Sequence, residues 1–153
     1  MKRFLIISLL AVVSAVCVSG QNKGNALSER GYVGNVGLSI SPFLGVGADL
    51  FTSHGYSLGN GLWLGGGTGV SCPSAYDVFL PAFVQVKYSF MADSKASPFI
   101  GGKVGAMTNF EDTVMILVPE IGADISRLSI FLSADFMAVG TIRYSLGFYW
   151  NFK

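Results

Sequence analysis

The residues with the clearest chemical potential are a histidine and a serine, His54 and Ser57. The stretch His54-Gly55-Tyr56-Ser57-Leu58-Gly59 contains G-x-S-x-G, the pattern of the nucleophile elbow in serine hydrolases. That elbow requires a strand, a sharp turn and a helix, and the acid and then the histidine follow the serine in the chain. Here no helical pattern follows Ser57, and the single histidine of the chain precedes it. We therefore interpret both as residues of a hairpin turn, where glycine and serine are common.

Metal and phosphate chemistry have weaker candidates. One histidine and one cysteine, Cys72, cannot supply a zinc site once Cys17 leaves with the N-terminal signal described below, and the acidic residues lack the spacing of a calcium loop. The run Gly65-Gly66-Gly67-Thr68-Gly69 lacks the lysine and the helix that follow a phosphate-binding loop, so we interpret it as a glycine-rich strand. We expect no metal and no cofactor.

A third candidate set consists of charged residues spread along the chain. Its members are Asp49, Lys87, Lys103, Glu120, Asp124, Asp135 and Arg143. Their spacing matches no catalytic motif, so their role depends on the elements that carry them.

The N-terminus has the pattern of a secretory signal peptide. Lys2 and Arg3 precede an apolar run over residues 4–13, and small residues follow up to Gly20. We predict cleavage after Gly20. Residues 1–20 then form the signal, and residues 21–30 form an N-terminal periplasmic segment.

The mature chain is close to neutral. Without Lys2 and Arg3, eight basic residues oppose nine acidic ones, a net charge of −1 that argues against nucleic-acid binding. A lipoprotein signal ending at Cys17 would need a small residue before the cysteine, where Val16 stands. Loss of Cys17 with the signal leaves Cys72 as a lone thiol, so no intrachain disulfide is possible.

The rest of the chain has the periodicity of β-strands. It contains no apolar run of the roughly 18–20 residues that a membrane helix needs. Apolar and polar residues alternate instead, as in strands with two different faces. We predict eight strands, over residues 32–41, 44–53, 61–71, 79–90, 98–107, 114–125, 128–138 and 141–152.

The seven charged residues all fall inside these strands, on the face opposite the large apolar side chains. In the strand over residues 79–90, for example, Val84 and Val86 share one face, whereas Gln85 and Lys87 share the other. A lysine or arginine facing lipid at mid-bilayer costs about 2–4 kcal/mol, so the charge-free face is predicted to face lipid. Because isolated buried charges are strongly unfavourable, we predict an interior salt-bridge network that plugs the barrel. A variant of this hypothesis is that the network acts as a gate and lets some ions leak through the barrel.

In lipid an unpaired strand edge has no water to satisfy it, so a membrane-spanning sheet must close. Tilted strands of about 9–11 residues cross the bilayer, and an even number of them returns both termini to the periplasm. We therefore predict an all-β fold, an eight-stranded antiparallel up-and-down transmembrane β-barrel over residues 31–153. The turn at residues 54–60 would face the periplasm. A soluble lipocalin-like barrel would carry a charge-rich outer face, whereas the polar face here is mostly glycine and serine.

The chain ends Ser145-Leu146-Gly147-Phe148-Tyr149-Trp150-Asn151-Phe152-Lys153. This resembles the C-terminal assembly signal of outer-membrane barrels, polar-x-Gly-x-x-aromatic-x-aromatic, with Ser145, Gly147, Trp150 and Phe152 at its four positions. Lys153 departs from that pattern, which usually ends at the aromatic residue. Residues 80–90 and 97–102 also resemble uncharacterised small outer-membrane β-barrel proteins, and the architecture over residues 31–153 is similar to the OmpA/OmpX type. The resemblance implies outer-membrane lipid and the barrel-assembly machinery as partners, and no activity.

Together these features predict an outer-membrane protein with a structural or surface-interaction role, a plugged interior and no open pore, and not an enzyme. Two alternatives stay open. One is a lipid-modifying outer-membrane enzyme, which the resemblance to small barrels also admits; the other is the soluble lipocalin-like carrier. The sequence identifies no surface ligand.

Overall fold

The alternation of the sequence continues into eight antiparallel strands. The computed structural model describes residues 26–42, 47–73, 77–94 and 96–153. The predicted signal peptide, residues 1–20, and residues 21–25 lie outside this part of the chain. The strands are β1 (Arg30–Ser41), β2 (Gly47–Leu58), β3 (Leu62–Cys72), β4 (Leu80–Ser89), β5 (Ala96–Thr108), β6 (Thr113–Ile125), β7 (Leu128–Met137) and β8 (Ile142–Phe152).

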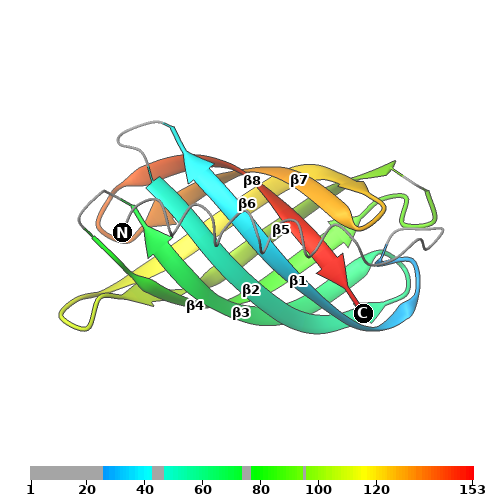
Figure 1. Ribbon diagram of the computed structural model, residues 1–153, viewed down its shortest axis with the longest axis horizontal. Coiled ribbons are helices and arrows are strands. Elements are labelled where there is room, and N and C mark those ends of the chain that lie inside the picture. Colours follow the sequence, from blue (N-terminus) through cyan, green and yellow to red (C-terminus); the bar gives the residue numbers. More distant parts are fainter. Residues whose placement is uncertain (1–25, 43–46, 74–76, 95) are drawn as a thin grey trace, which may run out of the picture.

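Each strand pairs with the next along the chain, and β8 pairs with β1, so the sheet closes into a barrel (Figure 1). The eight predicted strands are all present, and the predicted fold class is confirmed. We call the end at which β1 begins and β8 finishes the terminal end, and the opposite end the loop end. The short connections at residues 59–61 and 126–127 lie at the terminal end.

One predicted turn is misplaced. The turn expected at residues 54–60 is confined to residues 59–61, and β2 continues through His54 and Ser57 to Leu58. The physical reason is the pair Gly59 and Gly61, with φ of 80° and 84°. Glycine adopts these left-handed angles without steric penalty, so the chain reverses there. Residues 54–58 keep the alternation of a strand.

The two faces of the barrel wall differ in polarity as predicted. On β4, Val84 is 67% exposed on the outside and the adjacent Gln85 is 3% exposed inside. The outer face presents large apolar side chains on all eight strands. Among the Asp, Glu, Lys and Arg residues of the strands, only Arg30, the first residue of β1, is exposed. A barrel with this surface suits lipid, because water would meet mostly hydrocarbon. None of the described residues forms a helix that could span a membrane.

Candidate functional site

The lumen is the candidate site, because all seven charged residues singled out from the sequence lie in it. They form three groups along the barrel axis. Nearest the loop end, the Arg143 Nη2 atom lies 2.9 Å from Asp49 Oδ2 and 2.7 Å from Asp135 Oδ2. The Arg143 Nε atom donates a further hydrogen bond of 2.8 Å to Asp135. One guanidinium therefore pairs with two carboxylates, one on β2 and the other on β7.

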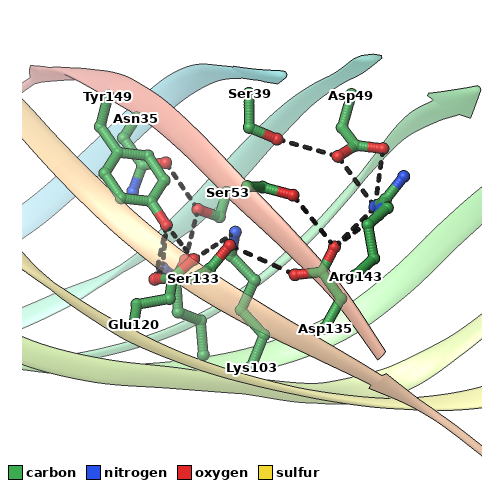
Figure 2. A network of polar contacts seen from close by, with 12 residues as sticks. Asn35, Ser39, Asp49, Ser53, Lys103, Glu120, Ser133, Asp135, Arg143 and Tyr149 are labelled. Carbon is green, nitrogen blue, oxygen red and sulfur yellow. Dashed lines mark hydrogen bonds and ion pairs between the residues drawn. The ribbon is translucent and has the colours of Figure 1, made fainter. Parts of the chain in front are cut away.

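Serine hydroxyls complete the shell of this group. Ser39 and Ser71 donate to Asp49, and Ser133 and Ser145 donate to Asp135. Figure 2 shows the contacts of Ser39 and Ser133. Within the described residues, Nη1 of Arg143 alone is a buried side-chain nitrogen or oxygen without a hydrogen-bond partner. Figure 2 shows the Arg143 guanidinium between Asp49 and Asp135, joined to both carboxylates by dashed lines. Each carboxylate thus has several donors, which offsets part of the cost of removing its charge from water.

The second group lies at mid-barrel. The Lys103 Nζ atom is 2.7 Å from Glu120 Oε1. The Tyr149 hydroxyl donates to both oxygens of Glu120, at 2.5 and 2.6 Å, and the Gln85 amide donates to Glu120 at 3.1 Å. Ser53 links Gln85 to Asn35 on the far wall. The chain of polar contacts therefore crosses the whole lumen at this level (Figure 2).

The third group lies nearer the terminal end. The Lys87 Nζ atom is 2.5 Å from Asp124 Oδ1, and Ser89 and Ser129 also donate to Asp124. Asn151 of β8 donates to Ser129 at 2.9 Å and so ties this group to the last strand.

Aromatic rings fill the space between the charged groups. The buried cluster comprises Phe51, Phe83, Phe99, Phe131 and Tyr149. The Lys103 Nζ atom lies 3.9 Å from the centre of the Phe51 ring, and the Lys87 Nζ atom lies 4.1 Å from the centre of the Phe99 ring. Both ammonium groups thus gain cation–π contacts in addition to their carboxylate partners. Alternation along the sequence puts Phe83, Phe131 and Tyr149 on the same face as the charged residues, but we assigned these rings no role from the sequence. Large rings on an otherwise small, polar face were the available signal.

Apolar side chains cluster near both ends of the lumen. Met107, Ile116 and Val118 form a cluster at the loop end, and Leu27 packs on Trp63 at the terminal end. A cavity of about 50 Å³ remains between the aromatic cluster and the loop end. Since one water needs about 10–15 Å³ of such a cavity, there is room in it for a few waters. Among the described residues no group of His, Cys, Asp or Glu side chains has the arrangement of a metal site.

His54 and Ser57 do not form a catalytic pair. Both lie on β2, and their positions differ by three, an odd number, so the two side chains point to opposite faces: His54 outward and Ser57 inward. His54 lies against Tyr32 and Thr52 on the outer wall, with the Tyr32 hydroxyl 2.5 Å from Nδ1 and the Thr52 hydroxyl 3.2 Å from Nε2. Ser57 is buried and donates to the carbonyl of Leu27 at 3.1 Å. Their interpretation as turn residues was wrong, and their separation onto two faces excludes a Ser57–His54 dyad.

The four residues of the C-terminal pattern have distinct places in the barrel. Ser145 is inside, 2.6 Å from the Ser41 hydroxyl. A Cβ atom on Gly147 would lie 2.5 Å from the Phe131 ring, so the position has no room for a side chain. Trp150 and Phe152 belong to the outward set of β8. Cys72, the lone thiol, ends β3 and is half-buried.

Comparison with known proteins adds one firm conclusion. No protein-family profile and no curated protein matches the chain. Among solved structures, the barrel is similar to the N-terminal β-barrel domain of Pseudomonas aeruginosa OprF, with a TM-score of 0.57 and 13% identity over 81% of this chain and 100% of that domain. The chain has the fold of a transmembrane β-barrel. A structure from the de novo design of transmembrane β-barrels is also similar, with a TM-score of 0.52 and 12% identity over 88% of this chain and 100% of the design. At these identities the similarity concerns the fold alone.

Proposed function

We propose that the protein is a structural outer-membrane β-barrel whose lumen is sealed and conducts no ions. The observation that carries this proposal is the filling of the lumen: three charged groups, an aromatic cluster and two apolar ends follow one another along the axis. Eight strands enclose an interior just wide enough for side chains, so such filling leaves no continuous water path. The absence of enzymatic activity is part of the proposal.

The location is proposed from the outer surface and the two chain ends. Exposed apolar side chains surround the barrel, and the last strand carries the pattern that resembles the assembly signal of outer-membrane barrels. Export through the predicted signal peptide would place the terminal end in the periplasm and the loop end at the cell surface. Fractionation with the outer membrane and an N-terminus at Gln21 are the expected results; recovery in the soluble periplasm, or an acylated Cys17, would refute this location.

Conductance of the pure protein in planar lipid bilayers tests the sealed lumen. The folded wild type should show no stable channels. A matched variant with Phe51→Ala and Phe131→Ala removes two rings from the middle of the lumen and should conduct, provided that its unheated gel mobility shows a closed barrel. Reproducible porin-sized channels from the wild type would refute the proposal.

Envelope lipid composition tests the alternative of a lipid-modifying enzyme. Cells expressing Ser57→Ala or His54→Ala should have the same lipid A as cells with the wild type, because the two side chains face opposite sides of the wall. A changed lipid A acylation pattern in either variant would support the alternative of a lipid-modifying enzyme.

A further inference from the structure

Residues 26–29 precede β1 and belong to no strand, yet part of this segment is buried. Leu27 is 1% exposed and packs in one cluster with Ala26, Val33 of β1 and Trp63 of β3. Trp63 is itself 1% exposed. We call residues 26–29 the N-terminal cap. An apolar side chain outside the sheet that is buried to this degree fills the terminal mouth of the barrel.

Two polar contacts hold the cap, one to β2 and one to the residue that follows β8, and a third contact joins the two strands beside it. The Leu27 carbonyl accepts a hydrogen bond from Ser57 of β2 at 3.1 Å. Next to it, Nε1 of Trp63 donates to the Val33 carbonyl at 3.0 Å. At the end of the cap, the Glu29 carboxylate lies 2.6 Å from the Lys153 ammonium group, one residue after β8. The cap therefore connects β2 and β3 to the end of the chain.

The part of the wall beside the cap is paired on one side only. β1 pairs with β2 along its whole length, but its pairing with β8 begins only at Gly34, opposite Phe152. The first part of β1, from Arg30 to Val33, extends beyond the end of β8. A strand segment paired on one side has weaker protection from opening than one paired on both sides. The contact between Glu29 and Lys153 spans this incomplete seam.

We propose that the N-terminal cap is a latch that docks into the terminal mouth after the barrel has closed and locks the β1–β8 seam. Its contacts require β2, β3 and the end of β8 together, so they cannot all form before β8 has paired with β1. The proposal rests on the fold and does not depend on which membrane holds the barrel.

Trp63 reports on the cap directly. The chain has two tryptophans, and Trp150→Phe leaves Trp63 as the only one. In the folded protein its fluorescence should resist quenching by aqueous acrylamide. Leu27→Asp and the milder Leu27→Ala should raise the quenching constant several-fold, whereas the matched Leu27→Met should leave it unchanged. If Trp63 stays shielded in a folded Leu27→Asp barrel, the cap does not close the mouth and the proposal is wrong.

Hydrogen exchange measured by mass spectrometry tests the lock on the seam. Backbone amides of residues 30–33 should exchange faster in Leu27→Asp and in Lys153→Met than in the wild type, and amides of residues 37–41 should not change. Unchanged exchange at residues 30–33 in both variants would overturn the seam-locking role. During folding into phosphatidylcholine vesicles, Trp63 shielding should appear no earlier than the gel shift of the closed barrel; earlier shielding would overturn docking as the last step.

Discussion

The tight packing of rings over the inner wall makes one substitution especially informative, Gly37→Ala on β1. A Cβ atom at Gly37 would lie 2.3 Å from two atoms of the Phe51 ring and 2.9 Å from the Tyr149 ring. Neither ring can move away easily, because both belong to the buried aromatic cluster and their centroids are only 5.4 Å apart. The added methyl group must therefore displace packed rings.

The expected magnitude follows from two opposing terms. Overpacking a well-filled core costs about 1–3 kcal/mol. Replacing glycine by alanine restricts the unfolded chain and returns about 0.4–1 kcal/mol. We expect Gly37→Ala to lower the free energy of unfolding by about 1–2 kcal/mol. On the outer face, a Cβ atom at Gly102 would meet nothing closer than 3.6 Å, so Gly102→Ala should be neutral or stabilising by up to about 1 kcal/mol.

Reversible urea unfolding in lipid vesicles, followed by gel shift, measures both variants. Phe51→Leu provides a further check, since it shortens the group that the new methyl would strike. The double variant Gly37→Ala with Phe51→Leu should lose less free energy of unfolding than the two single variants lose together, by at least about 0.5 kcal/mol. If Gly37→Ala is as stable as Gly102→Ala, the rings are not packed as described and the sealed lumen loses its main support.

Three further predictions concern the wall, the lumen and the cap. A probe on Val84→Cys should be quenched by spin labels on lipid acyl chains, whereas one on Gln85→Cys should not; Cys72 is first replaced by serine, and the reverse pattern would contradict the lipid-facing assignment. Arg143→Met leaves two buried carboxylates without their cation and should cost about 3–5 kcal/mol in the same urea assay, and a loss below about 1 kcal/mol would show that the ion pairs are solvated. The hydrogen bond from Lys153, together with its charge, lowers the pKa of the Glu29 carboxyl, so the contact stabilises the folded state above the ordinary pKa of Glu and is lost as the pH falls through the lowered value. Acid should therefore increase the quenching of Trp63 by acrylamide in the wild type. In Glu29→Gln, which lacks the carboxylate, the quenching should not depend on pH.

Much of the wall could be predicted from residue order, because strand formation has a local signature. Side chains alternate between two faces with a period of two, and β4 shows this from Leu80 to Ser89 without a break. The penalty for a charge in lipid makes the charged face the inner one, which correctly places Lys87 and Arg143 in the lumen. Because no water in the bilayer can satisfy a strand edge, the sheet must close. The fold class and the side of the wall on which each side chain lies therefore both follow from the sequence.

The partners within the lumen were decided only by the tertiary structure. Lys87 meets Asp124 and Lys103 meets Glu120, across β4–β6 and β5–β6, while Arg143 takes both Asp49 and Asp135. Alternation fixes the side of the sheet for each residue but not its height, because height depends on the register and stagger between strands. The sequence therefore predicted a network of these seven residues without assigning any pair in it.

The position of the turn at residues 59–61 and the burial of Leu27 both depend on contacts between strands, which the local sequence does not encode. His54-Gly55 and Gly59-Asn60-Gly61 are both plausible turns by composition, and the register of β2 with β1, from Ser41↔Gly47 to Arg30↔Leu58, selects the second. Leu27 lies outside every strand, so no periodicity marks it. Its place depends on a mouth formed by β1, β2 and β3, which exists only once the sheet has curved into a barrel and brought these strands around one apolar opening.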